Sequence, residues 1–181
     1  MASWSIAGSL TPEPADRRDD LLAPPVSRAL ASSDGDQPVA VVEIDPGLAD
    51  TAEFCAAYGS PMDASANCVV VAGKRAGEVR YAAVMVLAST RADVNGVVKR
   101  LLDVRKASFA PMGDAVSLTG MEYGGITPVG LPEDWPVYVD RAVADAPELV
   151  IGSGIRGSKL LVTGRFLSSL PTAQIIEDLA H

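Results

Sequence analysis

The most informative stretch of the chain reads Gly124-Gly125-Ile126-Thr127-Pro128-Val129-Gly130-Leu131. Neither a helix nor a strand tolerates this density of glycine and proline, so we predict a shaped loop over residues 120–136. Paired glycines let backbone N–H groups approach a ligand closely, and Pro128 fixes one dihedral angle before the ligand arrives. The segment 124–130, called the glycine loop below, can therefore form an oxyanion hole for acyl transfer. A glycine-rich turn without any ligand is the alternative interpretation.

The segments around this loop predict short strands and short helices in irregular order. Two apolar runs, 68–72 and 80–87, are separated by a turn sequence and predict a central hairpin. Asp93 precedes apolar residues at helical spacing and predicts a capped helix over 94–102. Further strands are expected at 39–44, 107–109, 137–139, 149–151, 160–162 and 174–176, and further helices at 51–58, with Asp50 as the cap, 114–118 and 164–170. This pattern predicts a mixed α/β (α+β) fold, with a mixed, partly barrel-like sheet surrounded by short helices.

Length and composition predict one folded domain. The chain has 181 residues, of which 48% are hydrophobic, and this is enough to bury a substantial core. Residues 1–37 are rich in proline and serine, and we interpret them as a partly extended arm with room for one short helix. Residues 38–181 form the expected domain.

Histidine, cysteine and hydropathy exclude several functional classes. The only histidine is His181, the last residue, so histidine triads and His/Cys zinc sites lack an imidazole, and we expect no metal and no cofactor. Cys55 and Cys68 are too few for a disulfide framework and predict reduced thiols, with a reactive thiol as the alternative. The longest apolar stretch, 81–88, is too short to cross a membrane, and the first residues make a poor signal peptide. We therefore expect a cytoplasmic protein without a membrane partner.

The charge pattern bears on nucleic-acid binding. A formal net charge of −8 opposes nonspecific attraction to phosphates, so DNA is not an expected partner. RNA contact would have to be local. The densest basic neighbourhood comprises Lys99, Arg100, Arg105 and Lys106, which either meet a few phosphates or are solvated residues that complement a helix end.

Four ordered landmarks carry a family resemblance. They are Leu118-Thr119-Gly120, then residues 124–131, then Val137-Tyr138-Val139-Asp140, and then Gly152-Ser153-Gly154. In this order they resemble the YbaK/ProX family, the editing domains associated with prolyl-tRNA synthetase. The resemblance covers residues 39–179 and leaves the N-terminal arm unexplained. It implies hydrolysis of the ester of wrongly charged aminoacyl-tRNA, notably alanine on proline tRNA, with a substrate ribose hydroxyl orienting the attacking water.

The resemblance also implies roles for individual residues. The loop from Gly124 to Pro128 would hold the aminoacyl carbonyl, with Gly124 and Gly125 as catalytic backbone donors. The implied substrate-binding residues are Ile126, Thr127, Pro128, Gly130, Asp140, Gly152, Ser153 and Gly154. Asp140 could equally cap the helix that follows it.

One family residue is replaced in this chain. Family editing domains carry a lysine at the start of the strand that matches residues 68–72, and an ungapped alignment puts Asn67 at that position. A neutral amide cannot supply a positive charge, although it still donates a hydrogen bond. Lys74, the obvious substitute, is expected in the hairpin turn, pointing away from the pocket. Asn67 and Cys68 should lie on opposite faces of the strand.

Two functional hypotheses follow. The first is a freestanding, trans-editing deacylase that binds the acceptor end of aminoacyl-tRNA and uses the glycine loop, with Asn67 as a catalytic polar contact. The second is a binding module of the same fold, weak or inactive as a catalyst, for an aminoacyl or nucleotide-like ligand; Asn67 and the acidic net charge favour it. A purely structural protein would leave the ordered glycine loop without a purpose. Either a monomer or a homodimer is compatible with the sequence.

Overall fold

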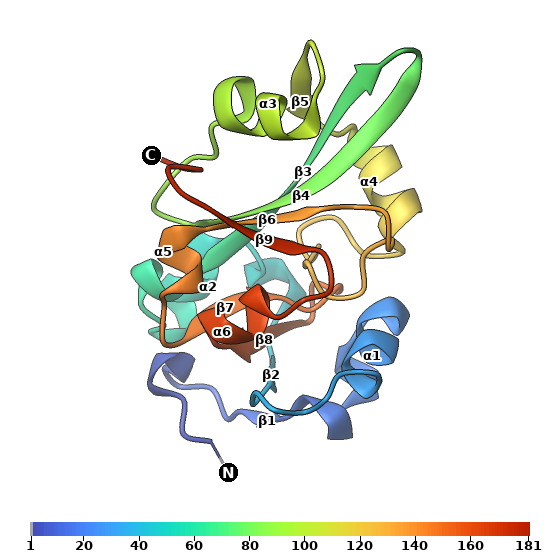
Figure 1. The fold of residues 1–181 in the computed structure, drawn as a ribbon. Helices are drawn as coiled ribbons and strands as arrows, with labels where there is room; N and C mark the ends of the chain where they lie inside the picture. The colour runs from blue at the N-terminus through green and yellow to red at the C-terminus, as the bar shows by residue number, and fades with distance from the viewer. Residues whose placement is uncertain (1) are drawn as a thin grey trace.

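The computed structural model describes residues 2–181 and contains two β-sheets with short helices around them (Figure 1). Its strands are β1 (Glu13–Pro14), β2 (Ala40–Glu43), β3 (Ala66–Arg75), β4 (Glu78–Leu87), β5 (Ala107–Phe109), β6 (Val137–Asp140), β7 (Leu149–Gly152), β8 (Ser158–Val162) and β9 (Ala173–Ile176). The α-helices are α1 (Pro24–Ala31), α2 (Thr51–Tyr58), α3 (Lys99–Leu102), α4 (Met112–Thr119), α5 (Arg141–Ala144) and α6 (Gly164–Ser168). Shorter helical turns are η1 (Ser5–Ala7), η2 (Ala15–Arg17), η3 (Asp19–Leu21), η4 (Pro46–Leu48), η5 (Met62–Ala64) and the π-helical η6 (Val94–Val98).

The mixed α/β fold is confirmed. One sheet has the order β1-β2-β8-β7 and is antiparallel, and the other has the order β5-β3-β4-β6-β9, in which β6 pairs in parallel with β4 and with β9. The two sheets are not closed into a barrel. A parallel bridge between Ser65 and Val150 joins them where β3 begins beside β7.

The predicted central hairpin is confirmed, with longer strands than expected. β3 and β4 pair over ten residues each, from Ala66 opposite Leu87 to Arg75 opposite Glu78. The turn consists of Ala76 and Gly77, whose φ angles of 51° and 84° are those of the two-residue turn that matches the twist of a hairpin. Lys74 therefore belongs to β3 and not to the turn, although its side chain is exposed as expected.

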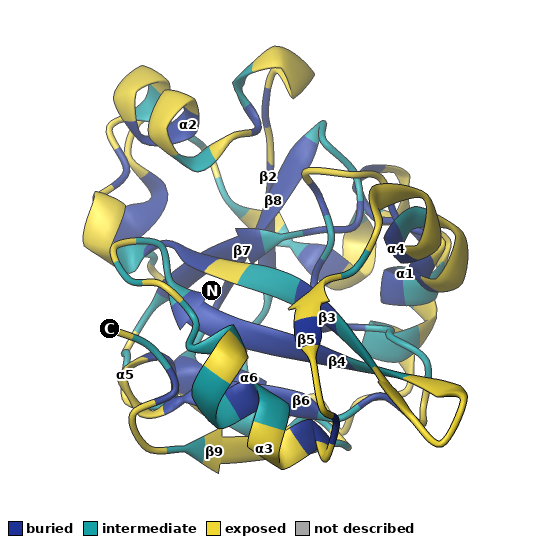
Figure 2. Ribbon diagram, turned by 90° about the horizontal axis from the view of Figure 1, so that it is seen from above, coloured by how far each residue is buried: buried dark blue, intermediate teal, exposed yellow. Residues whose placement is uncertain are grey.

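Alternation along the strands distributes the core over three layers. One face of each sheet contributes to the largest cluster, for example Met85 of β4 and Leu160 of β8. The opposite face of the five-stranded sheet packs on η6, α3 and the C-terminal segment, and the opposite face of the four-stranded sheet packs on α2. Figure 2 shows β4, β6, β7 and β8 largely buried, which explains why β4 is an almost continuous apolar run.

Helix ends follow the predicted signals with one exception. Asp93 accepts hydrogen bonds from the N–H groups of Gly96 (3.0 Å) and Val97 (3.2 Å), as expected for a cap. Gly120 ends α4 in the left-handed conformation, as predicted. Asp50 precedes α2, but its side chain makes no capping hydrogen bond. The expected cap at Asp50 is therefore wrong, and its carboxylate is free to face elsewhere.

Candidate functional site

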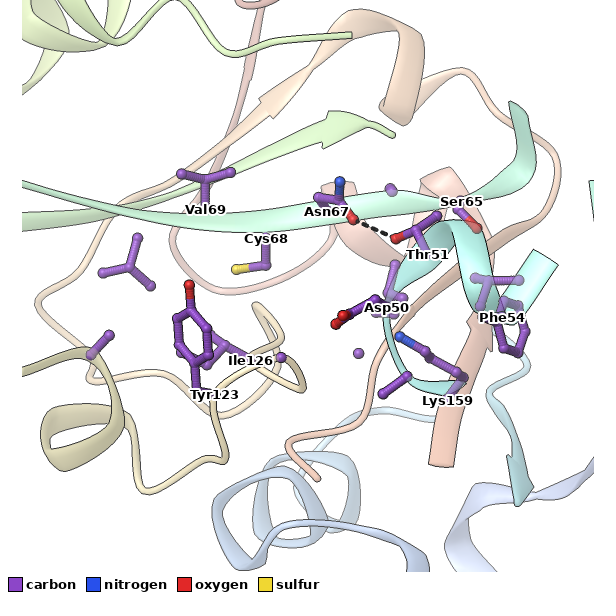
Figure 3. A pocket seen from close by; sticks show the side chains of 18 of the residues that line it. Asp50, Thr51, Phe54, Ser65, Asn67, Cys68, Val69, Tyr123, Ile126 and Lys159 are labelled. Atoms are coloured by element: carbon purple, nitrogen blue, oxygen red, sulfur yellow. Dashed lines mark hydrogen bonds between the residues drawn. The ribbon is translucent and has the colours of Figure 1, made fainter. Parts of the chain in front are cut away.

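A pocket of about 440 Å³ lies where β3 passes the glycine loop, the start of α2 and the ends of β7 and β8 (Figure 3). Its volume lies within the range of about 300–1,000 Å³ typical of small-molecule sites. The residues that line it are Ala49, Asp50, Thr51, Phe54, Ser65, Ala66, Asn67, Cys68, Val69, Val70, Phe109, Ala110, Ala115, Tyr123, Gly124, Ile126, Val150, Ile151, Gly152 and Lys159. The junction of the two sheets therefore forms the site.

The glycine loop makes one wall of the pocket, through Gly124 and Ile126. Gly125 holds the loop in place: its N–H donates to Glu122 O (3.0 Å) and its carbonyl accepts from Gly154 N–H (2.7 Å). A Cβ at Gly125 would lie 2.7 Å from Ile155 O, so only glycine fits between the two segments. Because its N–H is already bonded, Gly125 supports the loop, while Gly124 and Ile126 reach the pocket.

Strand β3 makes the opposite wall. The Cys68 thiol points into the pocket, as Figure 3 shows, and burial raises its pKa to about 12. The amide oxygen of Asn67 accepts a hydrogen bond from the Thr51 hydroxyl (3.2 Å) at the edge of the pocket. The Asn67 side chain thus lies on the other side of the strand from Cys68, in agreement with strand alternation.

Three charged side chains approach the pocket from the side of α2 and β8. Arg156 lies 3.5 Å from Asp50 (Nη1 to Oδ1) and donates to Pro46 O (3.3 Å, from Nε). Lys159 extends from β8, is only 8% exposed, and places its ammonium 5.7 Å from the ring centroid of Phe54. Burial lowers the pKa of Lys159; nearby Arg156 lowers it further, whereas Asp50 opposes the shift.

Aromatic side chains stand at the rim. Tyr123 is 58% exposed and Phe109 is 68% exposed, although both line the pocket. Large exposed apolar side chains beside a cavity are typical of ligand contact surfaces. The rim therefore offers flat surfaces on which a base or sugar can pack.

The structure brings together four of the residues predicted for the site, namely Asn67, Gly124, Ile126 and Gly152. The remaining seven are not among the lining residues: Gly125, Thr127, Pro128, Gly130, Asp140, Ser153 and Gly154. Ser153 and Thr127 are fully buried, and the Ser153 hydroxyl lies 3.1 Å from the carbonyl oxygens of Ile155 and Ser158. These contacts hold the turn between β7 and β8, and Gly154 in this turn donates a hydrogen bond to Gly125 of the glycine loop.

Asp140 has a contact elsewhere in the molecule. Its buried carboxylate accepts a hydrogen bond from the N–H of Leu179 (3.2 Å) and so anchors the C-terminal segment. It makes no side-chain capping bond to α5, which begins at the next residue. The alternative expectation of a helix cap is therefore wrong.

Sequence reasoning missed Asp50, Cys68 and Lys159 as members of the site. Lys159 carried a detectable signal, because Ser-Lys-Leu-Leu-Val places a charge inside an apolar run, and lysine is almost never fully buried without a partner. The predicted strand covers only residues 160–162, so Lys159 lies just outside it in that prediction. Asp50 gave no such signal, since an aspartate before a helix is the ordinary cap. In the part of the chain that the structure describes, no three His, Cys, Asp or Glu side chains are grouped as a metal would require.

Comparison with known proteins identifies the family. The model of the aminoacyl-tRNA editing domain matches residues 45–169, which is more than half of the chain. The chain belongs to the aminoacyl-tRNA editing domain family. The YbaK/ProX resemblance is thereby confirmed, and membership implies interaction with aminoacyl-tRNA. The match includes the glycine loop and every segment that lines the pocket.

Curated relatives of this editing domain are proline–tRNA ligases. The enzymes of Listeria monocytogenes serovar 1/2a and Listeria welshimeri are 32% and 31% identical to it over 75 residues. These matches cover 41% of this chain and 13% of each ligase. The similarity thus concerns a small part of the ligases.

Solved structures share the fold over a larger part of the editing domain. A crystal structure described as a candidate trans-editing enzyme for prolyl-tRNA synthetase has a TM-score of 0.71 and 25% identity, over 86% of this chain and 94% of that one. A candidate signal transduction protein from Marinobacter aquaeolei VT8 has a TM-score of 0.53 and 16% identity, over 86% of this chain and 30% of that one. The second likeness concerns the fold alone. Within residues 2–181, every helix is too short or too polar to cross a membrane.

Proposed function

We propose that this protein is a trans-editing deacylase that hydrolyses the ester of mischarged aminoacyl-tRNA, with a small amino acid such as alanine on proline tRNA as substrate. The observation that carries the proposal is the pocket between the glycine loop and β3, within a chain of the editing family. Similarity along 94% of a solved candidate trans-editing enzyme supports action without an attached synthetase. A cytoplasmic location is part of this proposal, because aminoacyl-tRNA is the proposed substrate.

The glycine loop is proposed to bind the acyl carbonyl. Gly124 and Ile126 line the pocket, and the bonds made by Gly125 to Glu122 and Gly154 keep the loop rigid. Rigid N–H donors stabilise the charge that develops on a carbonyl oxygen, typically by about 3–4 kcal/mol for each donor. Gly124 and Ile126 are therefore the proposed donors, and Gly125 is a positioning residue.

The apolar walls of the pocket are proposed to hold the acyl side chain. Cys68, Val70 and Ile126 are apolar, and the Cys68 thiol points inward. A pocket that fits one small side chain rejects a larger one through steric overlap. The exposed rings of Phe109 and Tyr123 lie where the terminal nucleoside of the acceptor end would enter.

The basic neighbourhood is proposed to contact the acceptor stem. Lys99 and Arg100 belong to α3, and Arg105 and Lys106 immediately precede β5, whose last residue, Phe109, lines the pocket. α3 and β5 lie side by side in Figure 1. The link to the pocket is Phe109, and this local positive charge is proposed to bind phosphates despite the net charge of −8.

A deacylation assay tests this function. Purified protein is incubated with alanyl-tRNA for proline, with correctly charged prolyl-tRNA and with other mischarged tRNAs, and released amino acid is quantified. We expect release from alanyl-tRNA well above the buffer rate and little from prolyl-tRNA. Protein purified in parallel with Gly125→Ala controls for contaminating deacylases. Release that persists unchanged in this variant, or that never exceeds the buffer rate, contradicts the proposal.

The second candidate is a binding module of the same fold. It is favoured by Asn67, whose amide is engaged by Thr51 at the position where the family carries a lysine. This candidate predicts saturable binding of aminoacyl-tRNA without release of amino acid. The same assay, combined with a filter-binding measurement, separates the two functions.

A further inference from the structure

Lys159 is an unusual lysine because it lies inside an apolar strand. Its neighbours in β8, Leu160 and Leu161, are fully buried, and Lys159 itself is 8% exposed. Removing an ammonium from water carries a large energetic cost unless the charge is paired and hydrogen-bonded. The position therefore requires an explanation beyond packing.

The charge of Lys159 is not neutralised by a close acidic partner. Asp50 raises the pKa of Lys159, but its carboxylate pairs with Arg156, at 3.5 Å. Within residues 2–181, no carboxylate oxygen comes within ion-pair distance of the Lys159 ammonium. The contact that remains is the Phe54 ring, 5.7 Å away, and a ring at that distance supplies a weak attraction.

The ammonium faces the pocket. Lys159 lines the cavity together with Asp50 and Asn67, and Figure 3 shows its nitrogen on the cavity side of β8, across from β3. The alignment placed the family cation at residue 67, where this chain has a neutral amide. The same pocket thus contains one buried cation, which comes from a different strand.

We propose that Lys159 is a catalytic residue of this pocket and replaces the lysine that residue 67 lacks, by donating a hydrogen bond to the carbonyl oxygen of the bound acyl ester. This inference rests on the proposed function and assigns the cation of that same site. Water adds to the carbonyl carbon, the carbonyl π pair moves to oxygen, and the ammonium stabilises the resulting oxyanion. The electron pair on the oxyanion then re-forms the carbonyl bond, and the bond between the carbonyl carbon and the ribose oxygen breaks. That oxygen takes the proton lost by the water, which leaves free amino acid and a tRNA with its hydroxyl restored.

The first experiment compares Lys159→Met with Lys74→Met. Methionine keeps the length and apolar stem of lysine, and Lys74 is an exposed lysine on β3 that serves as the matched control. We expect Lys159→Met to lower kcat by about 10²–10³-fold and to raise KM by about tenfold, because the hydrogen bond is made to the bound ester and strengthens as the oxyanion forms. Lys74→Met should match the wild type. A folded Lys159→Met protein with wild-type kcat overturns the inference.

The second experiment moves the charge back to β3. The double variant Asn67→Lys, Lys159→Met should have a kcat at least tenfold above that of Lys159→Met alone. The reason is that the cation returns to the same pocket from the family position. A merely structural role for Lys159 predicts no such recovery. If kcat does not recover, and Lys159→Met also has a lower melting temperature than wild type, the loss of activity reflects a structural role and the inference is overturned.

A binding measurement separates failure of this inference from failure of the proposed function. The probe is 3′-alanylamino-3′-deoxyadenosine, an amide that cannot be hydrolysed as an ester, titrated by calorimetry. We expect Lys159→Met to bind it at least tenfold more weakly than wild type or Lys74→Met. If wild type binds the probe in this Lys159-dependent way but releases no amino acid from any tRNA, the deacylase function fails and the Lys159 contact stands. If wild type does not bind the probe, both proposals fail.

A fourth measurement uses the wild-type chain, in case Lys159→Met does not fold. Limited acetylation with acetic anhydride, read by mass spectrometry, reports the accessibility of each lysine. The probe should slow acetylation of Lys159 severalfold and leave Lys74 unchanged. Equal acetylation of Lys159 with and without the bound probe overturns the inference.

Discussion

At Gly125 the backbone of the glycine loop presses against the segment that follows β7. An added Cβ would lie 2.7 Å from the carbonyl oxygen of Ile155. Because this oxygen belongs to the backbone, no change of side-chain rotamer can relieve the contact. We expect Gly125→Ala to lower the free energy of unfolding by about 1–3 kcal/mol, as for other overpacked sites. Denaturant unfolding measures this change.

Gly113 provides the matched control for that substitution. It lies in α4, has no atom within 4 Å of an added Cβ, and does not adopt a positive φ. Gly113→Ala should leave stability unchanged or raise it by up to about 1 kcal/mol, because alanine favours the helix. Equal effects of the two variants would show that the loop is not tightly packed against Ile155.

The thiol of Cys68 should be unreactive despite facing the pocket. The thiolate is the reactive form, and a pKa of about 12 leaves roughly one thiol in 10⁴ ionised at pH 8. We expect native Cys68 to be alkylated by iodoacetamide at least 100-fold more slowly than in urea, with a rate that keeps rising up to about pH 12. Peptide mass spectrometry follows the modification. Rapid native alkylation at pH 8 would restore the alternative of a reactive thiol.

The raised pKa of Cys68 also determines how its ionisation changes stability with pH. Above the ordinary thiol pKa the unfolded chain loses its proton while the folded chain keeps it, so the folded state binds more protons. Ionisation of Cys68 therefore favours unfolding between the ordinary thiol pKa and about 12, and leaves stability unaffected at neutral pH.

At the scale of elements, the helical segment over η6 and α3 depends on its cap. The Asp93 carboxylate satisfies the N–H groups of Gly96 and Val97, whereas Asp50 makes no such bond at α2. We expect Asp93→Ala to lower the free energy of unfolding by about 0.5–2 kcal/mol. Asp50→Ala, the comparison variant, should change stability by a few tenths of a kcal/mol at most, since its exposed pair with Arg156 contributes little. Thermal unfolding of both variants measures the two changes. Equal losses of stability in Asp93→Ala and Asp50→Ala would contradict the role of Asp93 as a cap.

The hairpin shows how an element sets the site. β4 is buried on both faces between β3 and β6, so it fixes the position of β3, and β3 in turn presents Cys68 and Asn67. Pairing of β2 with β8 places Lys159 opposite Val42, which directs it toward α2 and the pocket. The pairing of strands in the two sheets therefore determines which side chains line the pocket.

At the scale of the whole molecule, the N-terminal segment packs against the core of the domain. We propose that residues 1–37 form an arm added to a domain that begins at residue 38. The family match begins at residue 45, yet β1 pairs with β2, and Leu21, Leu22 and Val26 lie in the largest core cluster. The Ser158 hydroxyl donates to Leu21 O at 2.5 Å, which ties the arm to β8 beside Lys159.

The arm should therefore contribute to stability. Leu22 is 6% exposed, and Leu22→Ala is expected to lower the free energy of unfolding by about 2–5 kcal/mol. Leu118→Ala, at a leucine that is 47% exposed, should cost less than about 1 kcal/mol. Urea unfolding compares the two. If Leu22→Ala is as mild as Leu118→Ala, the arm does not share the core.

The sequence by itself determined the hairpin, most short strands, the loop and the family, because these depend on local patterns: alternation, glycine and proline density, and the order of four landmarks. Asp93 as a cap and Gly120 as a helix end were equally local. Lys159 and Asp50 were not predicted for the site, because β8 and the start of α2 meet β3 only through contacts between distant segments. Cys68 was missed because Asn67, expected on the opposite face of the strand, was the residue predicted to face the pocket. The tertiary structure alone decided that a lysine about 90 residues beyond Asn67 supplies charge to the same pocket. Local sequence fixes the backbone of each wall, whereas long-range pairing decides which side chains face one another across it.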